Sequence, residues 1–251
     1  MKLLCCLAVI ALLSIPCISY AEATAPTDSK TGWVDDFENY ECEGFVSLTA
    51  PWEDAASQGA YWDMGYKESQ GAEGPGYNWY YGHAWRPITV GQVLVAKMRL
   101  EPTTDYQSAK VGLVKDKSFE PLNGCFTGAN SASLTLHGDA SKKSAILVFG
   151  IDSYKGEKNS HREKEVKDLV SNVWYDVRLK VEGRDITAEY KPSDKNEWIS
   201  VGKMRAYDGF EPKYVGISGL RGGYLDDVGY TTLPPEKEQD KDKEKEKEKP
   251  K

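Results

Sequence analysis

The stretch VWYDVRLKVEGRDITAEY, residues 173–190, decides the fold of this 251-residue chain. From Tyr175 to Val181 every second residue is apolar, and the residues between them are charged. The same alternation returns from Ile186 to Tyr190. A period of two residues is the signature of half-buried antiparallel strands, with one face in the core and the other in water.

Similar runs recur along the chain, separated by Gly, Pro, Asn and Asp. One convincing helix candidate stands among them, Glu163–Val170. Many short strands with glycine-rich turns predict two packed antiparallel sheets, an all-β sandwich with one short helix at most. The other runs are Gly44–Thr49, Leu94–Leu100, Lys110–Lys115, Ser131–His137, Ser144–Gly150, Glu197–Met204, Tyr214–Ser218 and Tyr224–Thr231.

Three segments carry a resemblance to a known family: VDDFENY at 34–40, the stretch from Val173 to Trp198, and YLDDVGY at 224–230. Together they resemble the concanavalin A-like (laminin G-like) jelly rolls of bacterial exported proteins. The last motif is also shared with the galactose-binding type of jelly roll, so the exact sandwich stays open at this point. Because this superfamily includes lectins, glucanases, lyases and adhesion domains, the resemblance implies a fold and leaves the activity undecided.

The N-terminus has the layout of a secretory signal peptide, with Lys2 before an apolar run and Ser19-Tyr20-Ala21 before the expected cut. Cleavage after Ala21 predicts a secreted or periplasmic protein that keeps no membrane span; a lipid anchor at Cys17 is the alternative. We expect a signal peptide at 1–21, a flexible leader at 22–32, one β-sandwich domain at 33–233 and a disordered Lys/Glu tail at 234–251.

The mature chain keeps two cysteines, Cys42 and Cys125, and an exported protein with a single pair favours a disulfide between them. Two buried free thiols are the alternative. The formal net charge is −7, which argues against nucleic acid as a partner because no basic excess is available to bind phosphates.

Aromatic residues gather with Gly and Pro between Trp52 and Trp85. Flat rings with a polar atom at one end stack on sugar faces and bond their hydroxyl groups, so this segment predicts a carbohydrate-binding surface. The alternative is that many of these rings belong to the core. The predicted sugar-binding residues are Trp52, Trp62, Trp79, Tyr80, Tyr81 and Trp85.

Acidic residues open and close the domain: the pair Asp35-Asp36 with Glu38 near its start, and the pair Asp226-Asp227 near its end. The predicted Ca²⁺ ligands among them are Asp36, Glu38, Asp226 and Asp227. If the first and last strands lie side by side, these carboxylates meet, and Ca²⁺ prefers such oxygen ligands. The resemblance to carbohydrate-binding jelly rolls implies a structural Ca²⁺ there. The alternative is that neighbouring acids point to opposite faces of the sheet and one of each pair stays in water.

Catalysis has less support in the sequence. The Glu-x-Asp-x-(x)-Glu strand of laminarinase-type relatives does not occur, and neither do the lyase motifs. His83 with Tyr81 and Arg86 is the constellation that could serve a lyase or hydrolase, whereas His137 falls in a strand run and His161 in a charged loop. We therefore expect a non-catalytic, lectin-like or surface protein that recognises a polysaccharide or glycoconjugate. A polysaccharide-cleaving enzyme and a structural envelope domain are the alternatives.

Overall fold

The nine-stranded sheet of this chain is antiparallel throughout. Its main path runs β14 (Ile199–Arg205), β13 (Asp185–Pro192), β12 (Tyr175–Glu182), β7 (Val93–Leu100), β16 (Gly223–Thr231), β5 (Ala72–Glu73), β4 (Trp62–Met64) and β2 (Gly44–Val46). Strand β1 (Gly32–Asp35) also pairs with β16. The order shows that β16, near the end of the chain, lies at the centre of the sheet.

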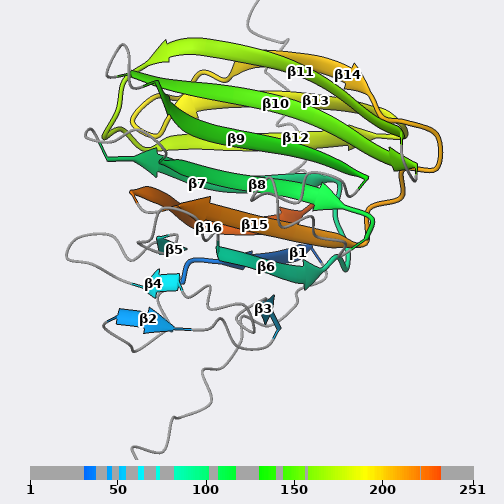
Figure 1. The fold of residues 1–251 in the computed structure, drawn as a ribbon, viewed down its shortest axis with the longest axis horizontal. Helices are drawn as coiled ribbons and strands as arrows, with labels where there is room; N and C mark the ends of the chain where they lie inside the picture. The colour runs from blue at the N-terminus through cyan, green and yellow to red at the C-terminus, as the bar shows by residue number, and fades with distance from the viewer. Residues whose placement is uncertain are drawn as a thin grey trace, which may run out of the picture.

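A second antiparallel sheet of seven strands completes the sandwich. Its order is β11 (Lys158–Leu169), β10 (Ser144–Lys155), β9 (Ser131–Asp139), β8 (Ser108–Val114), β15 (Tyr214–Leu220), β6 (Gly82–Pro87) and β3 (Glu53–Asp54). The two sheets lie face to face, and both extend from an edge formed by β11 and β14 to an edge formed by the short strands β2 and β3 (Figure 1).

These elements come from a computed structural model, whose description covers the following residues: 31–37, 44–46, 51–54, 62–64, 72–73, 82–101, 107–116, 130–139, 144–155, 158–220 and 222–232. Within these ranges all regular structure is strand, and no helix is present that could cross a membrane. The predicted signal peptide, leader and tail lie outside them, as do Cys42 and Cys125, so the predicted disulfide stays a prediction.

The alternation read from the sequence places the core between the sheets. In β12 the apolar residues Tyr175, Val177 and Leu179 are buried, and they belong to one hydrophobic core with Leu134 and Phe149 of the seven-stranded sheet. The charged residues between them are half-buried on the outer face. The all-β sandwich predicted from the sequence is thus confirmed.

Residues 163–170, predicted as a short helix, belong almost entirely to strand β11, so that prediction is wrong. The register explains why: Leu147, Val148 and Phe149 of β10 pair with Val166, Glu165 and Lys164. Backbone pairing along the whole strand outweighs the local propensity of a Lys/Glu-rich segment. At the edge of a sheet, such charged side chains also discourage pairing with another chain.

Strand β1 packs tightly against β16, the last strand of the chain that the structure describes. Gly32 has φ of 108°, and a Cβ added there would meet the Tyr230 carbonyl oxygen at 2.1 Å. Glycine is required at this position both for its backbone conformation and for the close approach. The expectation that the opening and closing strands lie side by side is therefore confirmed by the β1–β16 pairing.

Candidate functional site

The structure places the predicted sugar-binding rings in three different situations. Trp52 and Trp85 are buried, at 3% and 7% exposure, so neither presents a ring face to solvent. Trp62 lies in β4, which belongs to the nine-stranded sheet. Residues 79–81, which hold the other three rings, lie outside the described residues, and a binding surface there stays a prediction.

Trp52 belongs to a buried polar cluster centred on Asp35. Its indole Nε1 donates a hydrogen bond of 2.7 Å to Asp35 Oδ2, and the Phe37 backbone N–H donates one of 2.9 Å to Oδ1. Arg86 Nη1 lies 3.6 Å from the same Oδ2, and its guanidinium stacks on the Trp33 ring at 3.8 Å. Because Asp35 comes from β1 and Arg86 from β6, this cluster fastens one sheet to the other.

The cluster bears on the alternative catalytic set of Tyr81, His83 and Arg86. The Arg86 side chain is 2% exposed and lies between the sheets, where a polymeric substrate has no access. His83 is paired through its backbone with Ser218 in β15, and Tyr81 lies outside the described residues. Arg86, the member of this set whose side chain is described, therefore contributes to packing between the sheets.

Of the acids that open the domain, Asp35 is engaged in the buried cluster with Trp52 and Arg86. Asp36 is exposed, whereas Asp226 and Asp227 stand at a bulge of β16, where Asp227 Oδ2 lies 2.5 Å from Lys97 Nζ. Within the described ranges no group of three His, Cys, Asp or Glu side chains could hold a metal ion. Glu38 lies outside those ranges, so calcium at this position stays a prediction.

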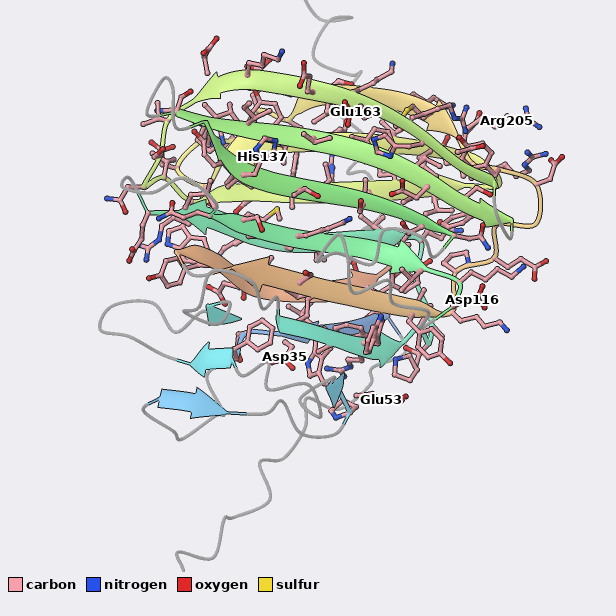
Figure 2. All side chains as sticks on the ribbon, viewed as in Figure 1. Asp35, Glu53, Asp116, His137, Glu163 and Arg205 are labelled. Carbon is pink, nitrogen blue, oxygen red and sulfur yellow. The ribbon has the colours of Figure 1, made fainter. Side chains whose placement is uncertain are left out.

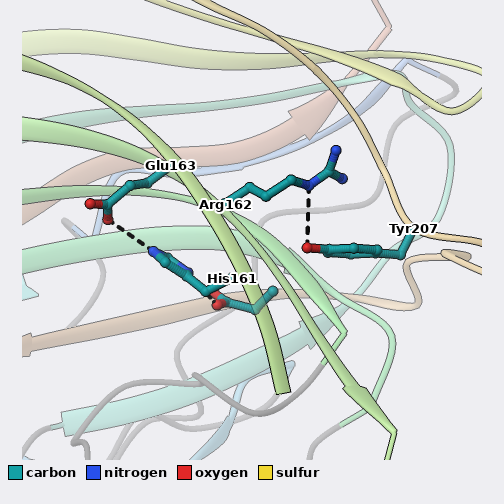
Figure 3. A network of polar contacts seen from close by, with 5 residues as sticks. His161, Arg162, Glu163 and Tyr207 are labelled. Carbon is teal, nitrogen blue, oxygen red and sulfur yellow. Dashed lines mark hydrogen bonds and ion pairs between the residues drawn. The ribbon is translucent and has the colours of Figure 1, made fainter. Parts of the chain in front are cut away.

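His161, expected in a loop, lies in β11 and contacts two carboxylates (Figure 3). Its Nδ1 is 2.6 Å from Asp152 Oδ1 and its Nε2 is 2.9 Å from Glu163 Oε2. Partial burial lowers the pKa of His161, but the hydrogen bonds to Glu163 and Asp152 outweigh it and raise that pKa above its ordinary value. With both ring nitrogens donating to carboxylates, the group is suited to holding a proton at the edge of the sheet.

One row across the outer face of the seven-stranded sheet consists mostly of small residues. Register aligns Trp85, Gly216, Gly112, Ser133 and Gly150 in one row that crosses five strands. All five are buried, and β8 is buried on both of its faces. This row contains a predicted ring, Trp85, but it does not offer an open surface in the described part of the chain.

The outer face of the nine-stranded sheet is different, because cross-strand ion pairs cover it. Glu189 Oε2 is 2.6 Å from Arg178 Nε and 3.0 Å from Lys180 Nζ, and Asp176 Oδ2 is 2.6 Å from Lys191 Nζ. Burial raises the pKa of Glu189, but the hydrogen bonds from Lys180 and Arg178 hold it below its ordinary value. These charges neutralise one another in register across the strands.

Two indoles stand on this same face. Trp198 lies over the Arg178 guanidinium at 3.9 Å, and Trp174 lies over that of Arg99 at 5.0 Å. The Arg99 guanidinium also faces the Tyr224 ring at 4.6 Å. Among the tryptophans whose side chains are described, Trp174 and Trp198 are the ones that keep part of their surface in water.

Trp174 and Trp198 lie in the segment that predicts the fold, but the sequence pattern did not identify them as site residues. A signal for Trp174 was present, because two aromatic residues, Trp174 and Tyr175, are adjacent at the start of a strand. Successive side chains of a strand point to opposite faces, so a buried Tyr175 directs Trp174 outward. No comparable signal exists for Trp198, which lies in the connection between β13 and β14.

Neither a family model nor a curated protein matches this chain, whereas many solved structures do. The exoplasmic/lumenal domain of VIP36, in its Ca²⁺/Man2-bound form, aligns at 12% identity over 85% of this chain and 91% of that one, with a TM-score of 0.55. The carbohydrate-binding module CBM66 from Bacillus subtilis aligns at 10% identity over 75% and 98%, with a TM-score of 0.47. A glycoside hydrolase family 16 endo-glucanase from Bacteroides ovatus aligns at 10% identity over 78% and 86%, also with 0.47. The chain is thus an all-β jelly roll of the concanavalin A-like fold.

Proposed function

We propose that this chain is an exported, non-catalytic carbohydrate-binding protein, lectin-like or displayed at a surface, that recognises a polysaccharide or glycoconjugate. Export rests on the charged, apolar and small-residue pattern of residues 1–21. Carbohydrate as the ligand class is supported at the level of fold by the VIP36 domain, whose matching structure carries Man2.

One observation carries the proposal: the outer face of the nine-stranded sheet presents two half-exposed indoles, Trp174 and Trp198, among hydrogen-bonding groups. An indole offers a rigid, flat apolar face that loses little conformational entropy when a sugar ring stacks on it. Neighbouring Arg, Lys and carboxylate groups can bond the sugar hydroxyls. This combination of a few rings and fixed polar groups is typical of a carbohydrate site.

The predicted aromatic segment adjoins this face. Strand β5 lies inside the segment 52–85 and pairs with β16 in the register Tyr224↔Glu73. Strand β4, which contains Trp62, is the next strand of the same sheet. The proposed surface thus extends from Trp174 across β16 toward β5 and β4.

Two placements support the non-catalytic part of the proposal over polysaccharide cleavage. Arg86 is enclosed between the sheets, and both ring nitrogens of His161 are engaged by carboxylates. A general base needs a ring nitrogen that can reach the substrate proton. The enzymatic alternative would depend on His83 and Tyr81, which the described side chains do not include.

Binding can be tested by gel retardation of the full chain on a panel of immobilised polysaccharides, backed by a glycan array. We expect Trp174→Ala to weaken retention about 10-fold or more, equivalent to about 1.4 kcal/mol. Ile199→Ala, which removes an exposed apolar side chain from β14, should leave retention unchanged. Trp79→Ala tests the adjoining predicted surface in the same gels.

Two results would overturn the proposal. The first is that the unaltered chain is retained by none of the polysaccharides. The second is that incubation with the same panel releases reducing ends or an unsaturated product, which would assign the chain to the cleaving enzymes.

A further inference from the structure

Arg99 is held in an unusual setting on the outer face of the nine-stranded sheet. Its guanidinium lies between the rings of Trp174 and Tyr224, at 5.0 and 4.6 Å. Its Nε is buried and, among the residues that the structure describes, has no hydrogen-bond partner. A donor left unbonded inside the protein is costly, and Arg99 as a whole is half-buried, so a ligand can approach this side chain and supply the partner that the described residues do not.

Arg178 provides an internal comparison, because it also stacks on an indole, Trp198. Its Nε donates a 2.6 Å hydrogen bond to Glu189, which stands opposite it on β13. Arg99 has Tyr224 opposite it on β16, while on its other side β12 has not yet begun, since Tyr175 pairs with Met98. Among the described residues, no carboxylate therefore takes for Arg99 the position that Glu189 takes for Arg178.

We propose that Arg99, clamped between Trp174 and Tyr224, binds an oxyanion of the ligand, the carboxylate or sulfate group of an acidic glycan. This inference rests on the proposed carbohydrate function and names the class of glycan. A planar guanidinium matches a carboxylate or sulfate with two parallel hydrogen bonds, and the two rings hold its plane in place before the ligand arrives.

The charges next to Arg99 are mostly engaged with protein partners. Glu101 accepts a 2.6 Å hydrogen bond from the Tyr224 hydroxyl. This bond directs the Glu101 carboxylate to the Tyr224 ring and holds that ring beside the Arg99 guanidinium. Lys97 points to the same face and is paired with Asp227, with Asp226 nearby. Because these neighbours carry one positive and three negative charges, they do not attract an anion themselves, and selectivity for an oxyanion has to come from the Arg99 hydrogen bonds.

The experiment compares polysaccharides that differ in the anionic group alone. Retardation of the full chain is measured in gels that contain dextran, dextran sulfate, polygalacturonate or methyl-esterified polygalacturonate. We expect at least one acidic polysaccharide to retard the chain more than its neutral counterpart does. The acidic polysaccharide with the larger increase shows whether sulfate or carboxylate is preferred. Arg99→Gln should weaken retention by the acidic polymer about 10-fold or more, a loss of about 1.4 kcal/mol.

Arg99→Lys separates the effect of two parallel hydrogen bonds from the effect of the positive charge. It keeps the positive charge but cannot form two parallel hydrogen bonds, so retention should fall between that of the unaltered chain and that of Arg99→Gln. Arg184→Gln removes one positive charge from an exposed arginine paired with Asp208, and it should have no effect. Thermal melts of all variants check that the fold is retained.

A direct readout follows the Nε–H signals of the arginines by NMR as sodium sulfate or sodium acetate is added. The signal of Arg99 should move and saturate, while that of Arg178, already bonded to Glu189, should stay in place. The inference is overturned if Arg99→Gln retains the acidic polymers as well as the unaltered chain does, or if the Arg99 signal does not respond. Retention of neutral glycans with an unresponsive Arg99 would refute this inference alone, whereas retention of no polymer at all would refute the proposed function.

Discussion

The two edges of the sandwich are closed by opposite means. On the side of the sandwich that ends at β2 and β3, the sheets are joined through β1 and β6 by a sealed cluster in which Asp35 bonds Trp52 and faces Arg86. At the edge of β11 and β14, exposed groups form the link, and Arg162 reaches the Arg205 carbonyl and the Tyr207 hydroxyl. Figure 2 shows Asp35 on the side of the short strands, with Glu163 and Arg205 at the opposite edge.

The difference between the edges is a difference in solvent. A buried ion pair gains little over apolar packing, yet removing one partner strands the other charge and costs about 3–5 kcal/mol. Exposed pairs contribute about 0–1 kcal/mol each because water and salt screen them. One edge therefore depends on each member of its cluster, while the other tolerates substitution and can respond to pH.

The largest effect is expected for Asp35→Ala. It leaves the Arg86 guanidinium buried next to Trp33 without its carboxylate, so we expect a loss of about 3–5 kcal/mol in the free energy of unfolding, measured in urea. Asp36→Ala, at the exposed neighbouring position, should stay within about 0.5 kcal/mol of the unaltered chain. Equal losses at the two positions would show that the cluster around Asp35 is not shielded from water.

Trp52→Phe should have the next largest effect. The substitution keeps an aromatic ring beside Phe37 and Trp33 but removes the Nε1–H donor to Asp35. Hydrogen bonds to charged groups contribute about 1.5–3 kcal/mol, and we expect a loss of that size in the same urea titrations. Trp198→Phe, on the partly exposed outer face, is the matched control and should cost less than about 1 kcal/mol. A loss at Trp198 as large as that at Trp52 would contradict this comparison.

The fold could be predicted because its signal is repeated. In β7, β12 and β13 every second residue is apolar, and each alternation sets the inner and outer faces of its strand independently. Strand β11 could not be predicted this way, since its side chains are charged on both faces and only pairing with β10 fixes it. Segment 158–169 is therefore a strand because of its pairing within the sheet, and not because of its own sequence pattern.

The site was harder to predict because composition does not reveal burial. Trp52 and Trp85 belong to the densest aromatic segment, yet both are enclosed. Trp174 and Arg99 are far apart in the sequence and meet because β7 pairs with β12. A pattern read along the chain can place a ring on a face, but the partner of that ring is determined by strand order.

Arg162→Ala tests the exposed edge. It removes a stack on the Tyr207 ring at 4.4 Å and two hydrogen bonds, all of them open to water. We expect a loss of about 0.5–1 kcal/mol in urea unfolding, with Lys167→Ala as a control on the same strand. A loss comparable with that of Asp35→Ala would mean that this edge, too, holds the sheets together through one residue.

The smallest expected effect is the pH dependence of stability that His161 gives to the edge of β11 and β14. Although partial burial lowers the pKa of His161, the hydrogen bonds to Glu163 and Asp152 raise it above the ordinary value of 6.5. A raised pKa in the folded state means that the stabilisation is fully present below pH 6.5 and is lost as the pH rises through the folded value. The His161 side chain is 50% exposed, so screening keeps the contribution below about 1 kcal/mol. His161→Gln should therefore be less stable than the unaltered chain in acid and nearly equal to it in mild alkali, and added salt should narrow the gap. Stability curves that stay parallel over the whole pH range would show that His161 carries no such linkage, whereas a gap that closes with rising pH would make this edge the one that senses protons.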